Sequence, residues 1–368
     1  MSTQPLIVVV AGGTGGHLFP AEALAEPLKA RGYRVALLTD HRARALTTQF
    51  ASQDMHVIES ATPVTRGLWS KAKALVALGR GFLQAKALLR RLDPLCVVGF
   101  GGYPTVPPLV AAAHLHIPAV LHEQNAVMGR ANRFLAAHVA AIATCFAQVS
   151  GLKPSDQKLL HKTGNPLRPK VLAARTPYHP PLPEGEIRIL ITGGSLGARI
   201  MSETVPAALA QLAPALRHRL RVIHQARAED LDACRAVYDK AAIRAELATF
   251  FADLPAHMAW AHLVIGRAGA STVAELAALG RPSLLVPYPG ALDQDQAANA
   301  NFLAQAGGAD VIAQSDFTPA WLADWLGRRL VDAAGLQKSA DAAQALAITD
   351  AAERLADLVL SVAKQERR

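Results

Sequence analysis

The chain has 368 residues, of which 51% are hydrophobic, 18% charged and 5% aromatic. This length predicts two domains with large buried cores, and the apolar content excludes a disordered chain. The net charge of +9 lies in the first half, because residues 1–163 carry 17 basic and 8 acidic side chains whereas residues 164–368 carry 21 of each. The asymmetry predicts an anionic partner for the first half, either a nucleic acid or an acidic membrane surface.

Short β-branched runs alternate with helical patterns, which is typical of βαβ units and parallel sheets. The strands predicted in the first half are Leu6–Ala11, Arg34–Thr39, Leu95–Phe100 and Ala119–His122, and a helix over Pro20–Arg31 is predicted to end at Gly32. The strands predicted in the second half are Ile187–Thr192, Arg221–Gln225, Ala248–Phe251, Leu263–Ile265 and Ser283–Pro287. The fold class predicted is α/β, with two Rossmann-like doubly wound domains facing a cleft at the carboxyl ends of both sheets.

Proline and glycine mark the junction between the halves, at Gly164–Pro169 and again at Pro177–Pro183. We therefore expect one domain over residues 1–163 and a second over 164–340. Prolines interrupt the uncharged stretch Pro104–Leu121, and Phe134–Leu152 reads as a buried helix followed by a strand, so no membrane-spanning helix is expected. The N-terminus has no basic region before its short apolar run and is not predicted to be a secretory signal.

The three cysteines, Cys96, Cys145 and Cys234, are widely spaced and form no CxxC pair. Neither a disulfide framework nor a zinc ribbon can be built from them, which favours a reducing compartment.

A glycine-rich loop, Gly12–Gly16, follows the first predicted strand directly. Such loops bring backbone N–H groups close to an anion at a helix N-terminus. The loop is not a Walker A motif, because His17 and Leu18 stand where Lys and Ser or Thr are needed, and Leu18 also breaks the dinucleotide fingerprint. Asp40, at the end of the second strand, lies where a ribose-binding acid would, so an NAD-dependent oxidoreductase is kept as an alternative.

Three further glycine loops, 99–104, 193–197 and 266–272, also follow predicted strands. One such loop is weak support for a ligand site, since tight turns use glycine for structural reasons alone. Four loops at strand ends in two domains predict a cleft that holds two phosphorylated ligands.

A basic amphipathic segment spans residues 66–91 within a stretch, 60–92, that has no acidic residue. Its basic side chains are Arg66, Lys71, Lys73, Arg80, Lys86, Arg90 and Arg91. Apolar residues alternate with them at helical spacing, with an interruption predicted at Gly79–Gly81. The pattern predicts docking on an anionic membrane surface, and the alternative is a crossover helix with a solvated basic face. No nucleic acid is expected as partner, because no binding module is recognisable and aromatic residues are scarce.

Seven motifs in order, GGTGGHLFPAEALA, GFGGYPT, HEQNAVMGRANR, TGNPLR, ITGGSLGA, GRAGASTVAEL and DQDQAANA, resemble the MurG family of bacterial N-acetylglucosaminyltransferases. The resemblance runs from residue 6 to about residue 302. It implies a GT-B fold and inverting transfer of N-acetylglucosamine from UDP-N-acetylglucosamine to undecaprenyl-pyrophosphoryl-N-acetylmuramyl-pentapeptide, with no cofactor and no required metal. It also implies a peripheral location on the cytoplasmic face of the inner membrane, and a C-terminal segment 341–368 that packs back on the first domain.

The resemblance also assigns residues to the donor. Those expected to bind it are Thr14, Gly15, Gly16, Asn125, Arg168, Ser195, Phe251, Ala270, Ser271, Thr272, Val273, Glu275 and Gln296. Glu275 would hold the ribose diol, for which a carboxylate with two acceptor oxygens is suited. Phe251 stands where the family has an aliphatic residue beside the uracil, and Ala268 where the family has serine.

Those expected to bind the acceptor are Gly12, Gly13, His17, Gly101, Gly102 and Tyr103. His17 is the candidate general base, because an imidazole titrates near neutrality and can take the proton of the attacking hydroxyl. His122 and Glu123 are the alternative candidates for the general base. A related transferase with another lipid acceptor, such as diacylglycerol, stays an alternative.

Overall fold

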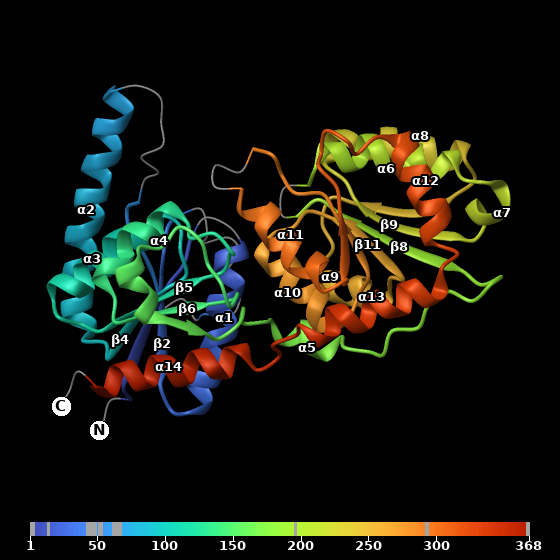
Figure 1. The fold of residues 1–368 in the computed structure, drawn as a ribbon. Helices are drawn as coiled ribbons and strands as arrows, with labels where there is room; N and C mark the ends of the chain where they lie inside the picture. The colour runs from blue at the N-terminus through green and yellow to red at the C-terminus, as the bar shows by residue number, and fades with distance from the viewer. Residues whose placement is uncertain are drawn as a thin grey trace. The chain divides into compact units, whose positions relative to one another are not determined.

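The computed structural model describes residues 4–12, 15–41, 50, 54–60, 68–194, 197–290 and 294–365, with the backbone alone at 68–75 and 365. The chain divides into two compact units (Figure 1). One unit comprises Met1–Arg168 and Ile348–Arg368, and the other comprises Pro169–Ala347.

The first unit is built on a seven-stranded parallel sheet with the order β3-β2-β1-β4-β5-β6-β7. Its strands are β1 (Leu6–Val10), β2 (Arg34–Thr39), β3 (Met55–Val57), β4 (Cys96–Gly99), β5 (Ala119–Glu123), β6 (Ala141–Thr144) and β7 (Leu160–Lys162). Its helices are α1 (Gly15–Ala30), α2 (Leu68–Leu92), α3 (Val106–His114), α4 (Arg130–Leu135) and α14 (Ala351–Gln365), with short 3-10 turns at Tyr103–Thr105, Ala136–His138 and Pro154–Leu159.

Alternate residues of β1 enter two different cores. Ile7 and Val9 pack with α1 and α14 on one face of the sheet, whereas Val8 and Val10 pack with α2, α3 and α4 on the other. Both faces of a parallel sheet are therefore covered, which explains why the strand reads as a continuous apolar run.

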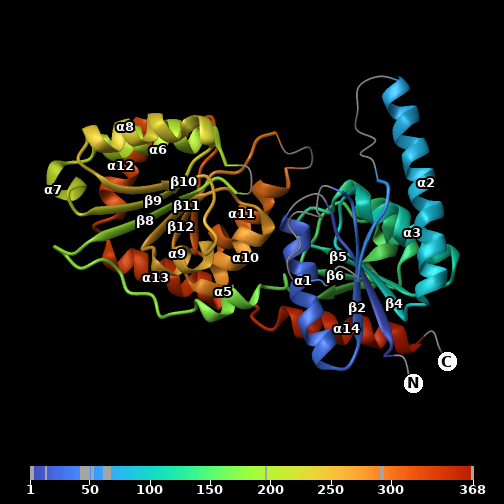
Figure 2. The ribbon, with the colours of Figure 1, turned by 180° about the vertical axis from the view of Figure 1, so that it is seen from behind.

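The C-terminal helix α14 lies beside α1 in both ribbon views (Figures 1 and 2). Leu355 and Val359 are fully buried in the core that α1 also fills. Arg31, at the end of α1, bridges Glu353 at 2.5 Å and Asp357 at 2.7 Å. The C-terminal segment is thus an integral layer of the first unit.

The second unit has a six-stranded parallel sheet with the order β10-β9-β8-β11-β12-β13. Its strands are β8 (Ile187–Thr192), β9 (Leu220–Gln225), β10 (Arg244–Ala248), β11 (Leu263–Gly266), β12 (Ser283–Leu285) and β13 (Ala309–Val311). Its helices are α5 (Pro169–Ala173), α6 (Arg199–Gln211), α7 (Pro214–Arg217), α8 (Leu231–Lys240), α9 (Leu254–Trp260), α10 (Ala270–Leu279), α11 (Asp295–Gln305), α12 (Pro319–Arg329) and α13 (Ala333–Ala345), and a 3-10 turn spans Ala228–Asp230. This strand order is that of the Rossmann fold.

Helices α6, α8 and α12 cover one face of the second sheet, and α5, α9, α10 and α13 lie on the other (Figure 1). The α/β fold with two doubly wound domains, predicted from the sequence, is confirmed.

The division between the units differs from the predicted boundaries. Residues 163–167 are buried in the first unit, and a side chain at Gly164, whose φ is +88°, would lie 2.8 Å from Ile348. The outgoing and returning segments meet there, so the first unit extends to Arg168 rather than to residue 163. At the other end, α13 packs on α10 in the second unit, and a side chain at Gly280 would lie 3.2 Å from Gln344. The returning segment therefore starts at Ile348 rather than at residue 341.

Two further expectations are corrected. Strand β10 ends at Ala248, where the predicted strand begins, because the apolar pair Phe250 and Phe251 drew the prediction towards the loop. Helix α2 continues through Gly79–Gly81 without interruption. Gly81 lies against the backbone carbonyl of Glu59, where a side chain has no room, so its glycine serves close packing.

Candidate active site

Two glycine loops lie side by side at the carboxyl edge of the first sheet. Gly12 follows β1, and Gly101 and Gly102 follow the neighbouring β4. A Cβ on Gly12 would lie 2.8 Å from the ring of Pro104. The φ angles of Gly101 and Gly102, +88° and +76°, lie in the left-handed region that favours glycine.

His17 stands in the first turn of α1, on these loops. Its Cδ2 would be 3.3 Å from a Cβ on Gly101, and its Cε1 would be 3.7 Å from a Cβ on Gly102. Burial lowers the pKa of His17 to about 4, so the imidazole is neutral at neutral pH. Tyr103, at the start of the next turn, is half-buried beside them.

Glu123, at the end of β5, is a buried carboxylate that organises the following loop. Its Oε1 accepts from the backbone N of Asn125 at 2.9 Å and from the Asn125 side chain at 3.4 Å. Its Oε2 accepts from the backbone N of Gly129 at 2.9 Å and from Asn132 Nδ2 at 2.8 Å. Burial raises the pKa of Glu123, and these hydrogen bonds act in the opposite direction.

Both oxygens of Glu123 are thus occupied by donors. Asn132, which donates to Glu123, also lies beside the glycine loop after β4, with its Nδ2 3.3 Å from the Cβ position of Gly101. His122 is fully buried, with its Nε2 at 3.1 Å from the Gly164 carbonyl, and burial lowers its pKa to about 4. It has a structural place in the core.

Arg168 lies at the end of the first unit, with its guanidinium 4.4 Å from the centre of the Phe19 ring. The sequence prediction placed Arg168 in the second domain, whereas the structure places it in the first unit. Gly15 and Gly16 begin α1, and Gly15 lies against the same ring, at 2.9 Å from its Cβ position. Gly13, Thr14 and Ser195 lie outside the described residues.

In the second unit, Glu275 is a buried residue of α10, a helix whose N-cap is Gly269. Ala270, Ser271 and Thr272 form its first turn and are half-buried. The Val273 side chain is buried, and its amide donates to the Gly269 carbonyl at 3.0 Å. Val273 therefore packs the helix and presents neither group to a ligand.

Three side chains fix the segments around α10. Gln296 accepts from the backbone N of Tyr288 at 3.0 Å, and the buried Asn299 donates to the carbonyl of Ala268 at 3.2 Å. Arg267, which the sequence reasoning missed, donates to the carbonyl of Val286 at 2.9 Å. These contacts hold the loops that lead into and past α10.

Phe251 is buried, and its ring meets His257 edge to face at 4.9 Å. The neighbouring Phe250 is 73% exposed at the end of β10 and is the aromatic surface available there. No sequence pattern distinguished Phe250 from Phe251.

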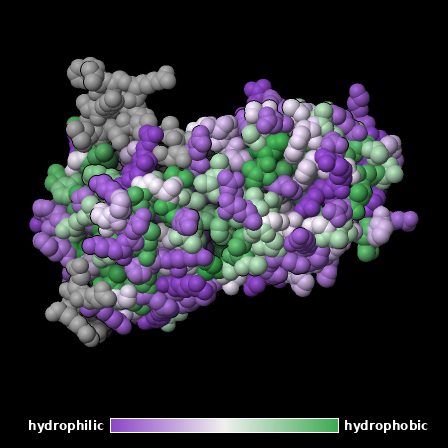
Figure 3. Space-filling model, in the orientation of Figure 1, coloured by the Kyte–Doolittle hydropathy of each residue, from purple (hydrophilic) through white to green (hydrophobic). Residues whose placement is uncertain are grey.

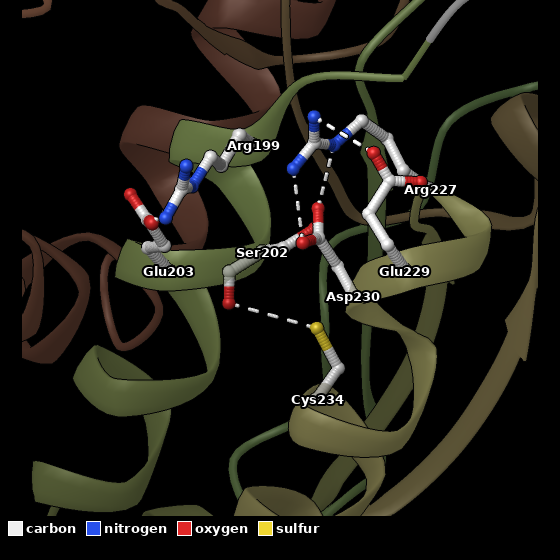
Figure 4. Close-up of polar contacts among 7 residues, drawn as sticks. All are labelled: Arg199, Ser202, Glu203, Arg227, Glu229, Asp230 and Cys234. Carbon is white, nitrogen blue, oxygen red and sulfur yellow. Dashed lines mark hydrogen bonds and ion pairs between the residues drawn. The ribbon is translucent and has the colours of Figure 1, made fainter.

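The loop 193–197 is bordered by the segment that follows β9. A Cβ on Gly197, whose φ is +69°, would lie 2.7 Å from Arg227 Cγ. Figure 4 shows the Arg227 guanidinium held by Asp230, with nitrogen–oxygen distances of 2.7 and 3.0 Å, and by Glu229 at 3.0 Å. The hydrogen bonds from Arg227 hold the pKa of Asp230 below its ordinary value.

Within the described residues, no group of three or more His, Cys, Asp or Glu side chains is placed to hold a metal ion. Over the same part of the chain, every helix is too short or too polar to cross a bilayer.

Comparison with known proteins identifies the class. The model of the glycosyltransferase family 28 N-terminal domain matches residues 7–144, and that of the C-terminal domain matches residues 188–355. Together with two doubly wound units, these matches define a glycosyltransferase of the two-domain GT-B class.

Relatives narrow this class to one family. A UDP-N-acetylglucosamine--N-acetylmuramyl-(pentapeptide) pyrophosphoryl-undecaprenol N-acetylglucosamine transferase of Methylobacterium nodulans is 55% identical over 98% of both chains. A protein of the same name from Rhodopseudomonas palustris is 53% identical over 99% of this chain and 100% of its own. The crystal structure of Acinetobacter baumannii MurG is 30% identical, with a TM-score of 0.77 over 97% of this chain and 100% of that one. The chain belongs to glycosyltransferase family 28 and, within it, to the MurG family, which confirms the resemblance seen in the sequence and displaces the oxidoreductase alternative.

Proposed function

We propose that this protein transfers N-acetylglucosamine from UDP-N-acetylglucosamine to the muramyl sugar of undecaprenyl-pyrophosphoryl-N-acetylmuramyl-pentapeptide. The observation that carries the proposal is the identity of more than half of the residues, over nearly the full length, to transferases whose names state this reaction. The glycine-rich strand ends of both units supply the backbone donors that two pyrophosphate-containing substrates need.

The second unit is the donor unit. Glu275 accepts the ribose hydroxyls, the N-terminus of α10 lies at the diphosphate, and Gln296 lies near the sugar. Phe250 and Phe251 lie at the uracil, where the exposed ring of Phe250 is available for stacking.

The first unit binds the acceptor and supplies the base. The acceptor hydroxyl oxygen attacks the anomeric carbon from the face opposite UDP, and its proton passes to the neutral imidazole of His17. The bond from the anomeric carbon to the UDP oxygen breaks, and its electron pair leaves with UDP. The configuration inverts, and loop dipoles stabilise the leaving diphosphate without a metal.

The protein works on the cytoplasmic face of the inner membrane, which it contacts through α2. Val76 and Leu83 are 56% and 64% exposed on this helix, and the exposed Arg80 and Arg90 share their face at helical spacing. Figure 3 shows hydrophobic beside hydrophilic surface where Figure 1 draws α2 and α3. Apolar and basic groups on one exposed helix face suit an anionic bilayer surface.

The test of the reaction is a transfer assay with UDP-N-acetylglucosamine and a short-chain pyrophosphoryl-muramyl-pentapeptide, run with and without EDTA. We expect product under both conditions. No product contradicts the function, and product only without EDTA contradicts the metal-free mechanism. Diacylglycerol as acceptor tests the related-transferase alternative in the same assay.

The membrane role is tested by sedimentation with vesicles of anionic or zwitterionic lipid. The variant Arg80→Glu/Arg90→Glu should lose binding to anionic vesicles while keeping transfer to the water-soluble acceptor. Unchanged binding would exclude α2 as the contact.

A further inference from the structure

The side chain of Gln225 joins two segments of the second unit that come from different strands. Gln225 is the last residue of β9, lies between β8 and β10 in the sheet, and is only 6% exposed. Its Oε1 accepts from Thr192 Oγ1, at the end of β8, at 2.8 Å. Its Nε2 donates to the carbonyl of Gly194 at 3.0 Å and to that of Thr249 at 3.3 Å.

One amide therefore holds the glycine loop after β8 and the segment that continues β10 to Phe250. The Gly194 carbonyl also accepts from the backbone N of Gly197 at 3.0 Å. With two donors on it, this carbonyl is engaged inside the loop and is not free to face an incoming anion. Arg227, two residues beyond Gln225, packs on Gly197, so the exit of β9 supports the loop at two points.

We infer that Gln225 is a positioning residue that sets the separation between the phosphate-binding loop and the nucleobase-binding segment, and so selects a nucleoside diphosphate as donor. The inference rests on the proposed function, in which the glycine-rich end of β8 is one of the strand ends that supply backbone donors to pyrophosphate and Phe250–Phe251 lies at the base. Gln225 acts through the backbone of both segments and is itself buried beneath them.

The amide is suited to this task because it donates and accepts at once. Both of its N–H groups point to carbonyls, and its oxygen takes the hydroxyl of Thr192, which itself receives the amide of Gly194 at 3.4 Å. Leucine fills the same space without these bonds. Glutamate keeps the bond to Thr192 but cannot donate to either carbonyl.

The test compares the binding of UDP and of uridine by calorimetry in Gln225→Leu, Thr192→Val and the wild type. Gln225→Leu removes three hydrogen bonds and Thr192→Val removes two, and we expect about ten- to thirty-fold weaker binding of UDP in these variants. In Thr192→Val, which leaves the bond from Gln225 to Thr249 in place, uridine should bind within about twofold of wild type, which corresponds to about 0.4 kcal/mol. In the transfer assay the KM for the donor should rise, with kcat and the KM for the acceptor little changed.

Tyr238→Phe is the matched control. It removes a buried hydrogen bond of 2.9 Å to His224 on the opposite side of β9 and touches neither donor segment. Its thermal stability should fall as in the test variants while UDP binding stays unchanged. If Gln225→Leu does not fold, the binding of UDP and uridine by Thr192→Val still tests the role of Gln225.

UDP binding within twofold of wild type in both variants, or equal weakening of UDP and uridine in Thr192→Val, overturns the role of Gln225. Absence of UDP binding in the wild type would instead overturn the proposed function.

Discussion

The two units share a strand order but differ in the buried groups that hold the segments after their strands. In the first unit a buried carboxylate, Glu123, accepts four hydrogen bonds from the loop that follows β5 and from Asn132 of α4. The amide of Gln124 donates there to the carbonyl of Phe100, in the glycine loop after β4. In the second unit neutral amides, Gln225 and Asn299, do the equivalent work on backbone carbonyls. A charge orders several donors at once but is costly to bury, whereas an amide bridges two segments at low cost.

This difference agrees with the roles proposed for the units. In the proposed function the first unit supplies an imidazole as the proton acceptor, and the second positions two segments around the nucleotide. Substitutions in each unit test this contrast.

The largest effects are expected at the residues proposed to act on the acceptor and on the donor. His17→Ala should lower kcat by about 10²–10⁴-fold, the range for loss of a general base, and leave the affinity for UDP unchanged.

Glu275→Ala should instead raise the KM for the donor much more than that for the acceptor. Steady-state kinetics with each substrate varied measures both, and a His17→Ala variant with wild-type kcat would remove the base assignment.

Glu123→Gln should destabilise the first unit by about 3 kcal/mol, because hydrogen bonds to a charged group are lost and an amide would face N–H donors. Asn299→Leu in the second unit should cost about 1–2 kcal/mol, since one buried carbonyl loses its donor. Urea unfolding measures both, and Glu26→Gln on the exposed side of α1 is the control. Equal losses from the two changes would contradict the contrast between charge and amide.

Buried histidines should give both units the same response to acid. Burial lowers the pKa of His122 in the first unit and of His224 in the second from 6.5 to about 4. As the pH falls from 6.5 to 4 the unfolded chain takes up protons that the folded chain does not, so the free energy of unfolding decreases by about 1.4 kcal/mol per pH unit for each histidine. Above pH 6.5 these two histidines add nothing further to the free energy of unfolding.

Chemical unfolding between pH 4 and 7 measures that slope. His122→Asn and His224→Asn should each reduce it by one proton, whatever they do to the absolute stability. An unchanged slope would show that the histidine in question is protonated in the fold.

The smallest effect separates two glycines of α2. Gly79→Ala, with nothing within 4 Å of the added Cβ, should stabilise the protein by about 0.5–1 kcal/mol through helix propensity. Gly81→Ala should destabilise it, because the Cβ meets the carbonyl of Glu59. Thermal melting of both variants decides this, and two shifts of the same sign would contradict the close packing of α2.

The candidate site residues were predicted from local motifs. His17 and Glu275 stand in glycine-rich loop–helix sequences whose backbone requirement is local, so the turn and the side chain are specified together. Gln225 and Asn132 were not found, because their partners lie 31 and 9 residues away and only the folded sheet brings them together. A polar residue at the end of an apolar strand was the one available signal for Gln225.

The sequence by itself determined the two parallel α/β units, the positions of their glycine loops and the family, because hydrophobic period and turn chemistry act over a few residues. The tertiary structure alone decided that residues 163–168 and α14 belong to the first unit, that α2 continues through its glycines, and that Glu123 is a hub of hydrogen bonds. Those outcomes depend on burial and on contacts between distant segments, which no local pattern encodes.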